Sequence, residues 1–218
     1  MNIFPNIFLK RIQQAIHVTN KFHYILDNGH GGVINGVYQT QGKRSPIYDN
    51  KQIFEGVYNR EIVNIIYKYL NKINISCEKL VPEQEDISLK ERVKRVNNIY
   101  KNKPNSILIS IHLNAGGGSG YEIYTSKGEY FSDKIASLFL QYFEEHQNQF
   151  PIRKDISDGD DDKEANFYIL KHTYCPAILT ENLFMDKRSN FNYLISDAGK
   201  KKITQMHINS IINCEKYL

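Results

Sequence analysis

The stretch Ile107–Ile111 (ILISI), followed directly by His112, decides the fold class because almost every residue in it is apolar. A short, continuous apolar run is typical of a central strand that is buried on both faces of a sheet. Tyr24–Asp27 and Ala177–Thr180 are further short strands of this kind, and amphipathic segments separate them. Strands that alternate with helices predict an α/β fold: a single domain with a mixed, mostly parallel sheet flanked by helices on both faces.

The segments between the strands carry apolar residues at helical spacing, with recognisable start signals. One helix is expected to begin near Asn59. Ser88 and Glu91 have the spacing of a capping box that opens a second helix, and Asp197 is a candidate cap for the last one. The acidic segment Asp155–Glu164 has no periodicity, so we expect a solvated loop there; its spacing does not match a calcium-binding EF-hand loop.

Composition places the chain among ordinary globular domains. It has 218 residues, of which 41% are hydrophobic, and a net charge of +4. No apolar run approaches the ~20 residues needed to span a membrane. The basic residues are scattered rather than clustered, which argues against nucleic acid as a partner. Cys77, Cys175 and Cys214 are too far apart to match a disulfide framework or a paired-cysteine zinc site, so free thiols are expected.

The N-terminal segment differs from the rest of the chain. Its apolar residues recur at helical spacing, which predicts an amphipathic helical extension over residues 1–20 and one catalytic-sized domain over residues 21–218. Such a helix would pack on the domain or mediate self-association. No basic region precedes the apolar residues and no small-residue cleavage site follows them, so we expect synthesis in the cytoplasm without a secretory signal.

Four polar residues are placed where loops leave the predicted sheet. His30 follows the first strand inside a glycine turn, His112 and Glu181 end two further strands, and Glu55 precedes the helix expected near Asn59. A lone histidine at a strand end is usually structural, but two histidines and a carboxylate form the three-ligand set of a catalytic zinc, with a fourth position for water. Glu181 would be a second carboxylate nearby, or simply a solvated strand-end acid.

The glycines around His30 fit a loop that brings the backbone close to a ligand and needs positive φ, although a plain tight turn would look the same. The remaining histidines are predicted to be structural or on the surface: His17, His23, His146, His172 and His207.

These residues carry a family resemblance. The segments Asp27–Gly32 (DNGHGG), Glu55 with Asn59, Ser110–Ala115 (SIHLNA) and Glu181–Phe184 (ENLF) occur in the order seen in the N-acetylmuramoyl-L-alanine amidases called amidase 3. The resemblance runs from the first predicted strand to the C-terminus. It implies a zinc enzyme that cuts the amide between N-acetylmuramic acid and the L-alanine of the peptidoglycan stem peptide.

By the same resemblance, His30, Glu55 and His112 would bind one Zn²⁺ per chain, and Glu181 would be the catalytic carboxylate. Arg153 looks like an arginine that the family carries. The segment from Val33 to Phe54 is only loosely similar to the family, so Glu61 stays open as the competing carboxylate.

Two other functions use the same fold and remain open. A zinc peptidase would cut the stem peptide itself, because its metal chemistry is the same. A wall-binding protein would keep the fold without turnover. For an enzyme without an export signal, the expected setting is wall lysis after release from the cell, as by a phage or prophage endolysin, with peptidoglycan as the partner.

Overall fold

A computed structural model describes residues 20–128, 130–146, 149–157 and 159–218. Its main sheet has six strands in the order β4-β1-β5-β8-β6-β7, and neighbouring strands are parallel except for the antiparallel pair β6 and β8. The strands are β1 (His23–Asn28), β4 (Cys77–Lys79), β5 (Ser106–Asn114), β6 (Tyr121–Thr125), β7 (Lys163–Glu164) and β8 (Ala177–Phe184). A separate hairpin joins β2 (Val33–Ile34) to β3 (Val37–Tyr38).

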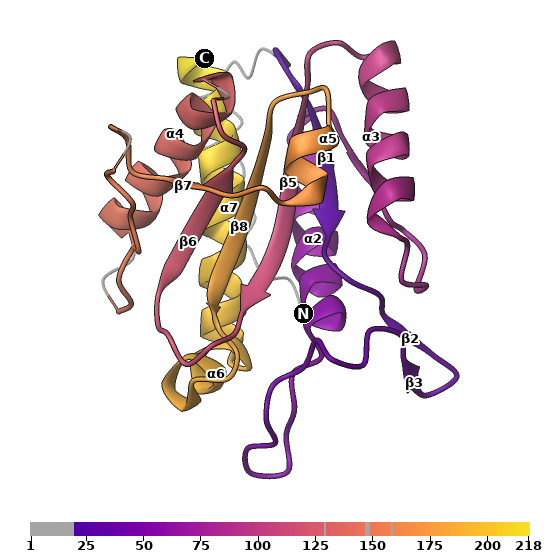
Figure 1. The fold of residues 1–218 in the computed structure, drawn as a ribbon, viewed down its shortest axis with the longest axis vertical. Helices are drawn as coiled ribbons and strands as arrows, with labels where there is room; N and C mark the ends of the chain where they lie inside the picture. The colour runs from indigo at the N-terminus through magenta and orange to yellow at the C-terminus, as the bar shows by residue number, and fades with distance from the viewer. Residues whose placement is uncertain (1–19, 129, 147–148, 158) are drawn as a thin grey trace.

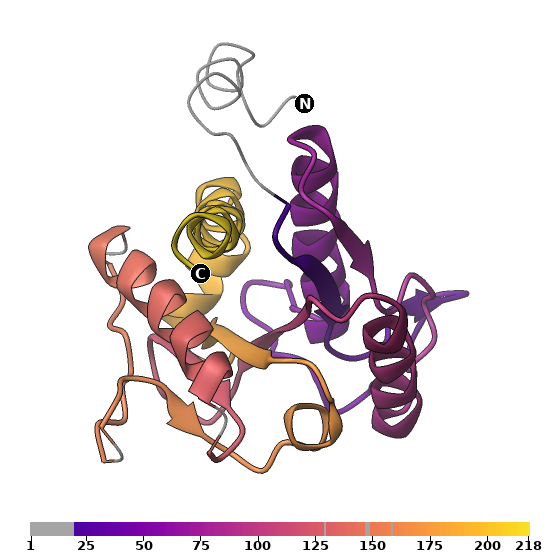
Figure 2. The ribbon, with the colours of Figure 1, turned by 90° about the horizontal axis from the view of Figure 1, so that it is seen from above.

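Helices cover both faces of the sheet, as Figures 1 and 2 show. On one face α2 packs on β1 and β5, while α4 and α7 pack on each other and α4 on β6 and β8. On the other face α3 contacts β5, and the short α5 contacts α3 and β8. The helices are α2 (Glu55–Lys72), α3 (Leu89–Asn102), α4 (Tyr130–His146), α5 (Tyr168–His172), α6 (Arg188–Leu194) and α7 (Asp197–Tyr217). The predicted fold class is therefore confirmed.

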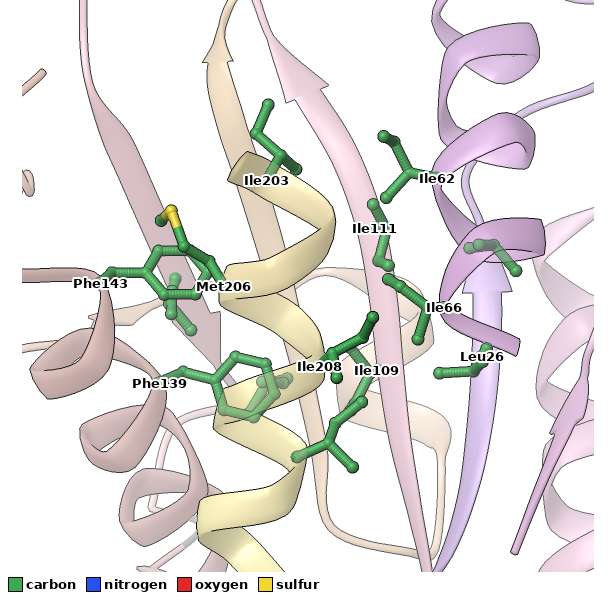
Figure 3. Packing of buried hydrophobic residues seen from close by; sticks show 14 of the residues in the cluster. Leu26, Ile62, Ile66, Ile109, Ile111, Phe139, Phe143, Ile203, Met206 and Ile208 are labelled. Atoms are coloured by element: carbon green, nitrogen blue, oxygen red, sulfur yellow. The ribbon is translucent and has the colours of Figure 1, made fainter. Parts of the chain in front are cut away.

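The alternation of side chains along the central strands explains why both faces are covered. Leu26 of β1 and Ile109 of β5 pack against α2 and α7 in the larger cluster of buried residues, part of which Figure 3 shows. Their chain neighbours Ile25 and Leu108 point to the opposite face and pack with Val96 of α3. Strands β1 and β5 are therefore apolar on both faces, and a single layer of helices could not bury them.

Two helix starts differ from the expected ones. The helix predicted to begin near Asn59 begins at Glu55, one turn earlier, with Phe54 as a cap that makes no side-chain hydrogen bond. The residue at the cap position is apolar, and groups distant in sequence accept from the first N–H groups instead: Glu55 N donates to Lys43 O at 2.9 Å and Gly56 N to Tyr38 Oη at 3.0 Å. The cap of α7 is Ser196, whose Oγ accepts from Gly199 N at 3.0 Å, rather than the neighbouring Asp197.

The capping box at α3 forms in part. Ser88 Oγ accepts a hydrogen bond from Glu91 N at 3.3 Å, as predicted. The Glu91 carboxylate, however, contacts Arg95 Nε at 3.3 Å. This ion pair with the residue one turn later takes the place of the second capping-box hydrogen bond, in which the Glu91 carboxylate would accept from Ser88 N.

Further expectations concern the termini and the cysteines. Residues 1–19 of the predicted N-terminal helical extension lie outside the described residues. Cys77, Cys175 and Cys214 are free thiols, as their spacing predicted. In the part of the chain that the structure describes, no helix combines the length and hydrophobicity needed to cross a membrane.

His207 of α7 is a fully buried histidine with a defined protonation state. Its Nδ1 lies 2.8 Å from Ile203 O, which can only accept, so Nδ1 carries the proton. Nε2 lies 3.0 Å from Thr180 Oγ1 and accepts from that hydroxyl, which itself accepts from the Asn182 amide at 3.2 Å. Burial lowers the pKa of His207 to about 4 from the usual 6.5.

This histidine makes stability dependent on pH. Below pH 6.5 the unfolded chain binds a proton that the folded chain does not take up until about pH 4, so acidification favours unfolding. The contribution lost by pH 4 is about 3 kcal/mol. We expect His207→Gln, which keeps an acceptor for Thr180, to flatten urea-measured stability between pH 7 and 4. His146→Gln, which alters an exposed histidine, should not, and equal slopes in wild type and His207→Gln would contradict the assignment.

Candidate metal centre

The polar residues singled out in the sequence come together where β1, β5 and β8 approach their carboxyl ends, at the lower edge of the sheet in Figure 1. His30 is the second residue after the end of β1, and Glu55 is the first residue of α2. His112 and Glu181 are directly paired in the parallel register of β5 and β8. Both lie within their strands rather than at the ends, since β5 continues to Asn114 and β8 to Phe184.

One carboxylate oxygen links the two histidines. Glu55 Oε1 lies 3.3 Å from His30 Nε2 and 3.1 Å from His112 Nδ1, and it also accepts from Leu113 N at 3.2 Å. One possible ligand atom from each of the three side chains lies within 4.8 Å of the others. The competing carboxylate, Glu61, is not part of this group: it is exposed and binds Lys200 Nζ at 2.8 and 2.9 Å.

The charges of this group are mutually dependent. Glu55 is only 2% exposed. Burial alone would raise its pKa, but hydrogen bonds from His112 and His30 outweigh burial and hold the pKa of Glu55 well below its usual value. Burial would lower the pKa of His112, but the Glu55 carboxylate overrides it and the net shift is upward. The pair therefore places an ionised carboxylate against imidazoles in a buried setting.

Glu181 is in the opposite electrostatic situation. Its Oε2 is buried and has no hydrogen-bond partner among the described residues. Burial raises its pKa to about 8, the charge of His112 opposes that shift, and the nearby carboxylates of Glu55 and Glu122 add to it. Glu55 and Glu181 thus differ in proton affinity. Such a difference lets one carboxylate stay ionised as a ligand while the other exchanges a proton.

Among the described residues, Arg153 is connected to Glu181 only through Glu122. Its Nε contacts Glu122 Oε1 at 2.7 Å, and its guanidinium stacks over the Phe184 ring at 5.3 Å. Lys163 Nζ reaches the same Glu122 oxygen at 2.9 Å. Glu122 is paired with Glu181 in the antiparallel register of β6 and β8, so these cations flank the site without reaching the histidines.

The glycines near His30 are required for space rather than for positive φ. It is His30 itself that takes the left-handed conformation, with φ of 70°. A Cβ added at Gly29 would lie 2.1 Å from His112 Cε1, and one at Gly32 would lie 1.8 Å from Gln84 Oε1. The expectation of positive φ at these glycines was wrong; what the structure shows at them is close packing against other protein groups.

Sequence reasoning missed the residues that hold the His30 turn in place. Arg92 of α3 is buried and donates to Asp27 Oδ1 at 2.5 Å, to Asn28 O at 2.9 Å and to His30 O at 3.2 Å. Ser110 Oγ donates to Asp27 Oδ2 at 2.7 Å, which ties β1 to β5. The available signal was a single arginine on the helix stripe otherwise made of apolar residues.

A pocket of about 260 Å³ opens beside the two histidines. Its lining includes the two histidines, the apolar residues Ile87, Leu89 and Ile169, and the charged residues Asp27, Asp86 and Arg92. The pocket is therefore formed between the carboxyl end of the sheet and the helices α3 and α5. A bound molecule could contact the histidines and an apolar wall at once.

The donor set fits zinc better than other divalent ions. Two imidazole nitrogens and a carboxylate match the three-protein-ligand set of catalytic zinc. Calcium and magnesium prefer oxygen ligands throughout. The buried Glu55 carboxylate lies between His30 and His112, so a cation held by the three side chains would be paired with its negative charge.

Residues 25–213 match the sequence profile of the family described as N-acetylmuramoyl-L-alanine amidase. A 103-residue segment, 47% of the chain, is 34% identical to N-acetylmuramoyl-L-alanine amidase CwlM of Bacillus licheniformis. An alignment of 204 positions, which covers 88% of this chain, is 26% identical to the endolysin of Bacillus phage SPP1. The chain spans only 38% and 66% of these two relatives.

The fold also matches a solved structure, that of N-acetylmuramoyl-L-alanine amidase AmiC2 of Nostoc punctiforme. The TM-score is 0.69 at 19% sequence identity, over 90% of this chain and 98% of the other. At that identity the likeness concerns the fold.

Proposed function

Because the chain belongs to the N-acetylmuramoyl-L-alanine amidase family, we propose that it hydrolyses the amide between N-acetylmuramic acid and L-alanine in bacterial peptidoglycan. His30, Glu55 and His112 would hold one Zn²⁺ per chain, and Glu181 would act as the catalytic carboxylate. The observation that carries this proposal is the convergence of three ligand-type side chains within 4.8 Å, with Glu181 paired to His112 on the next strand.

When bound, zinc would supply Lewis-acid chemistry: it polarises the scissile carbonyl and lowers the pKa of water at the site to ≈ 7. The role left for the chain is proton transfer. Glu181 has the features of that group, because its Oε2 has no hydrogen-bond partner in the described chain and its pKa of about 8 lies near neutrality. In its ionised form, the Glu181 carboxylate would take a proton from the attacking water and deliver it to the nitrogen of the departing L-alanine.

The surrounding residues position these groups. Arg92 fixes the carbonyl of His30 and the side chain of Asp27, so the turn between β1 and the pocket cannot shift freely. Asn182 donates to His112 O at 3.1 Å and steadies the strand pair that carries the histidine and Glu181. The pocket between the sheet and α3 would receive part of the muramyl peptide.

The biological setting proposed is wall lysis. The similarity to the endolysin of phage SPP1, which extends over 88% of this chain, supports it. In that setting the enzyme meets peptidoglycan once it is released from the cell in which it was made.

The direct test is digestion of purified peptidoglycan with zinc-loaded protein, followed by mass spectrometry of the fragments. The expected products are stem peptides with a free L-alanine amino terminus and glycan strands with intact muramic acid. Cleavage between amino acids of the stem would instead identify a peptidase. Binding to the wall without any new termini would identify a wall-binding protein, and either result would overturn the amidase proposal.

A further inference from the structure

A second group of acidic side chains lies away from the candidate metal centre, at the edge of the sheet formed by β6 and β7. Asp133 belongs to the first turn of α4, while Asp160 and Asp162 precede β7. One carboxylate oxygen from each lies within 4.8 Å of the other two. Asp162 is only 1% exposed, and its Oδ2 accepts from Thr125 Oγ1 at 2.8 Å.

Two oxygens of this group, one from Asp160 and one from Asp162, have no hydrogen-bond donor beside them among the described residues. Asp162 Oδ1 and Asp160 Oδ1 are both buried, and no donor from another described residue reaches either of them; the two carboxyl groups face each other instead. Burial, together with Asp160 and Asp133, raises the pKa of Asp162 to about 7, against the hydrogen bond from Thr125. A buried carboxylate among like charges needs either a proton or a cation.

We propose that Asp133, Asp160 and Asp162 form a calcium-binding site. The donors are all carboxylate oxygens, which are the ligands of hard cations and not of zinc. Three oxygens within 4.8 Å of one another have a common centre no further than about 2.8 Å from each. Small movements would therefore bring all three to the 2.3–2.6 Å of calcium coordination, and calcium accepts irregular geometry where magnesium requires a near-ideal octahedron.

The site would join three parts of the fold that are separate in sequence. Thr125 ends β6, Asp133 lies in α4, and Asp162 is followed directly by Lys163 of β7. Lys163 pairs with Tyr124 across β6 and β7 and reaches Glu122 at 2.9 Å. A bound calcium ion would thus fasten to the sheet the two-residue strand β7, whose Lys163 binds Glu122.

This site was not expected from the sequence. The acidic segment lacks the spacing of a calcium-binding loop, and a solvated loop was predicted. The structure adds Asp133 from a helix well before the segment and buries Asp162, so the ligand set is formed by tertiary contacts rather than by a local motif.

The test is calcium titration of the zinc-loaded chain by calorimetry, with thermal unfolding followed by circular dichroism. Calcium about a hundredfold above its Kd should raise the Tm by about 5–10 °C, and Mg²⁺ should require much higher concentrations. Asp162→Asn keeps the size and the Thr125 hydrogen bond. It should lose the calcium response while being at least as stable as wild type without calcium, because one like charge is gone.

Asp160→Asn gives a second variant should Asp162→Asn not fold. Asp155→Asn, in the same segment but outside the group, should respond to calcium as wild type does. Absence of calcium binding in wild type, an undiminished response in the folded variants, or an equal response to Mg²⁺ would each overturn the proposal. The readouts do not depend on hydrolysis, so a failure here is distinguishable from a failure of the proposed amidase activity.

Discussion

Replacing Glu181 with glutamine is expected to lower the rate of peptidoglycan hydrolysis by about 10²–10⁴-fold while the protein keeps its zinc. The amide has nearly the shape of the carboxylate but cannot accept a proton from water. Glu181 Oε2 makes no hydrogen bond with the described residues, so the change disrupts no contact seen in the fold. The loss should therefore be in kcat rather than in folding or metal content.

The measurement is release of soluble fragments from purified wall, with zinc content determined on the same samples. Glu61→Gln is the matched control, because Glu61 is an exposed glutamate bound to Lys200 and is not part of the histidine group. Its activity should equal that of wild type. If Glu181→Gln hydrolyses the wall at the wild-type rate, Glu181 is not the proton-transfer group.

The sequence contained enough information to predict the sheet and the histidine group. Apolar runs such as Ile107–Ile111 predict central strands because they are continuous, which indicates burial on both faces, and because they are too short for a buried helix. Once those strands are parallel, their carboxyl ends lie at one edge, and this placed His112 beside Glu181. The prediction that Glu55 lies near the histidines depended on the family resemblance, because Glu55 belongs to a helix and its position does not follow from the strand order.

The contacts that could not be predicted join positions distant in sequence. Arg92 of α3 binds Asp27, which lies 65 positions earlier in the sequence. Asp133 of α4 lies close to Asp162, which precedes β7. The position of Arg92 on an apolar helix stripe indicates that its side chain is buried, but neither pair leaves a signal in the sequence that identifies the partner. The left-handed φ of His30 was also missed, because sequence patterns assign that conformation to glycine. The glycines Gly29 and Gly32 instead leave room for the side chains that pack against them.

Replacing His112 with alanine is expected to release the metal and with it nearly all hydrolysis. His112 is one of two imidazoles facing Glu55, so His30 and one carboxylate would remain. Loss of a residue that merely orients a ligand already costs 10–100-fold in metal affinity, so loss of a ligand should exceed about 100-fold.

The variant also removes the ring against which Gly29 packs and one hydrogen bond to the buried Glu55, so folding must be measured alongside metal binding. His112→Asn keeps a donor near Glu55 and serves as the second variant if alanine destabilises the chain. His172→Ala, a change at an exposed histidine of α5, should retain full zinc content. Stoichiometric zinc in a folded His112→Ala protein would place the metal elsewhere, because the three ligand-type side chains form a single group and its affinity depends on all of them.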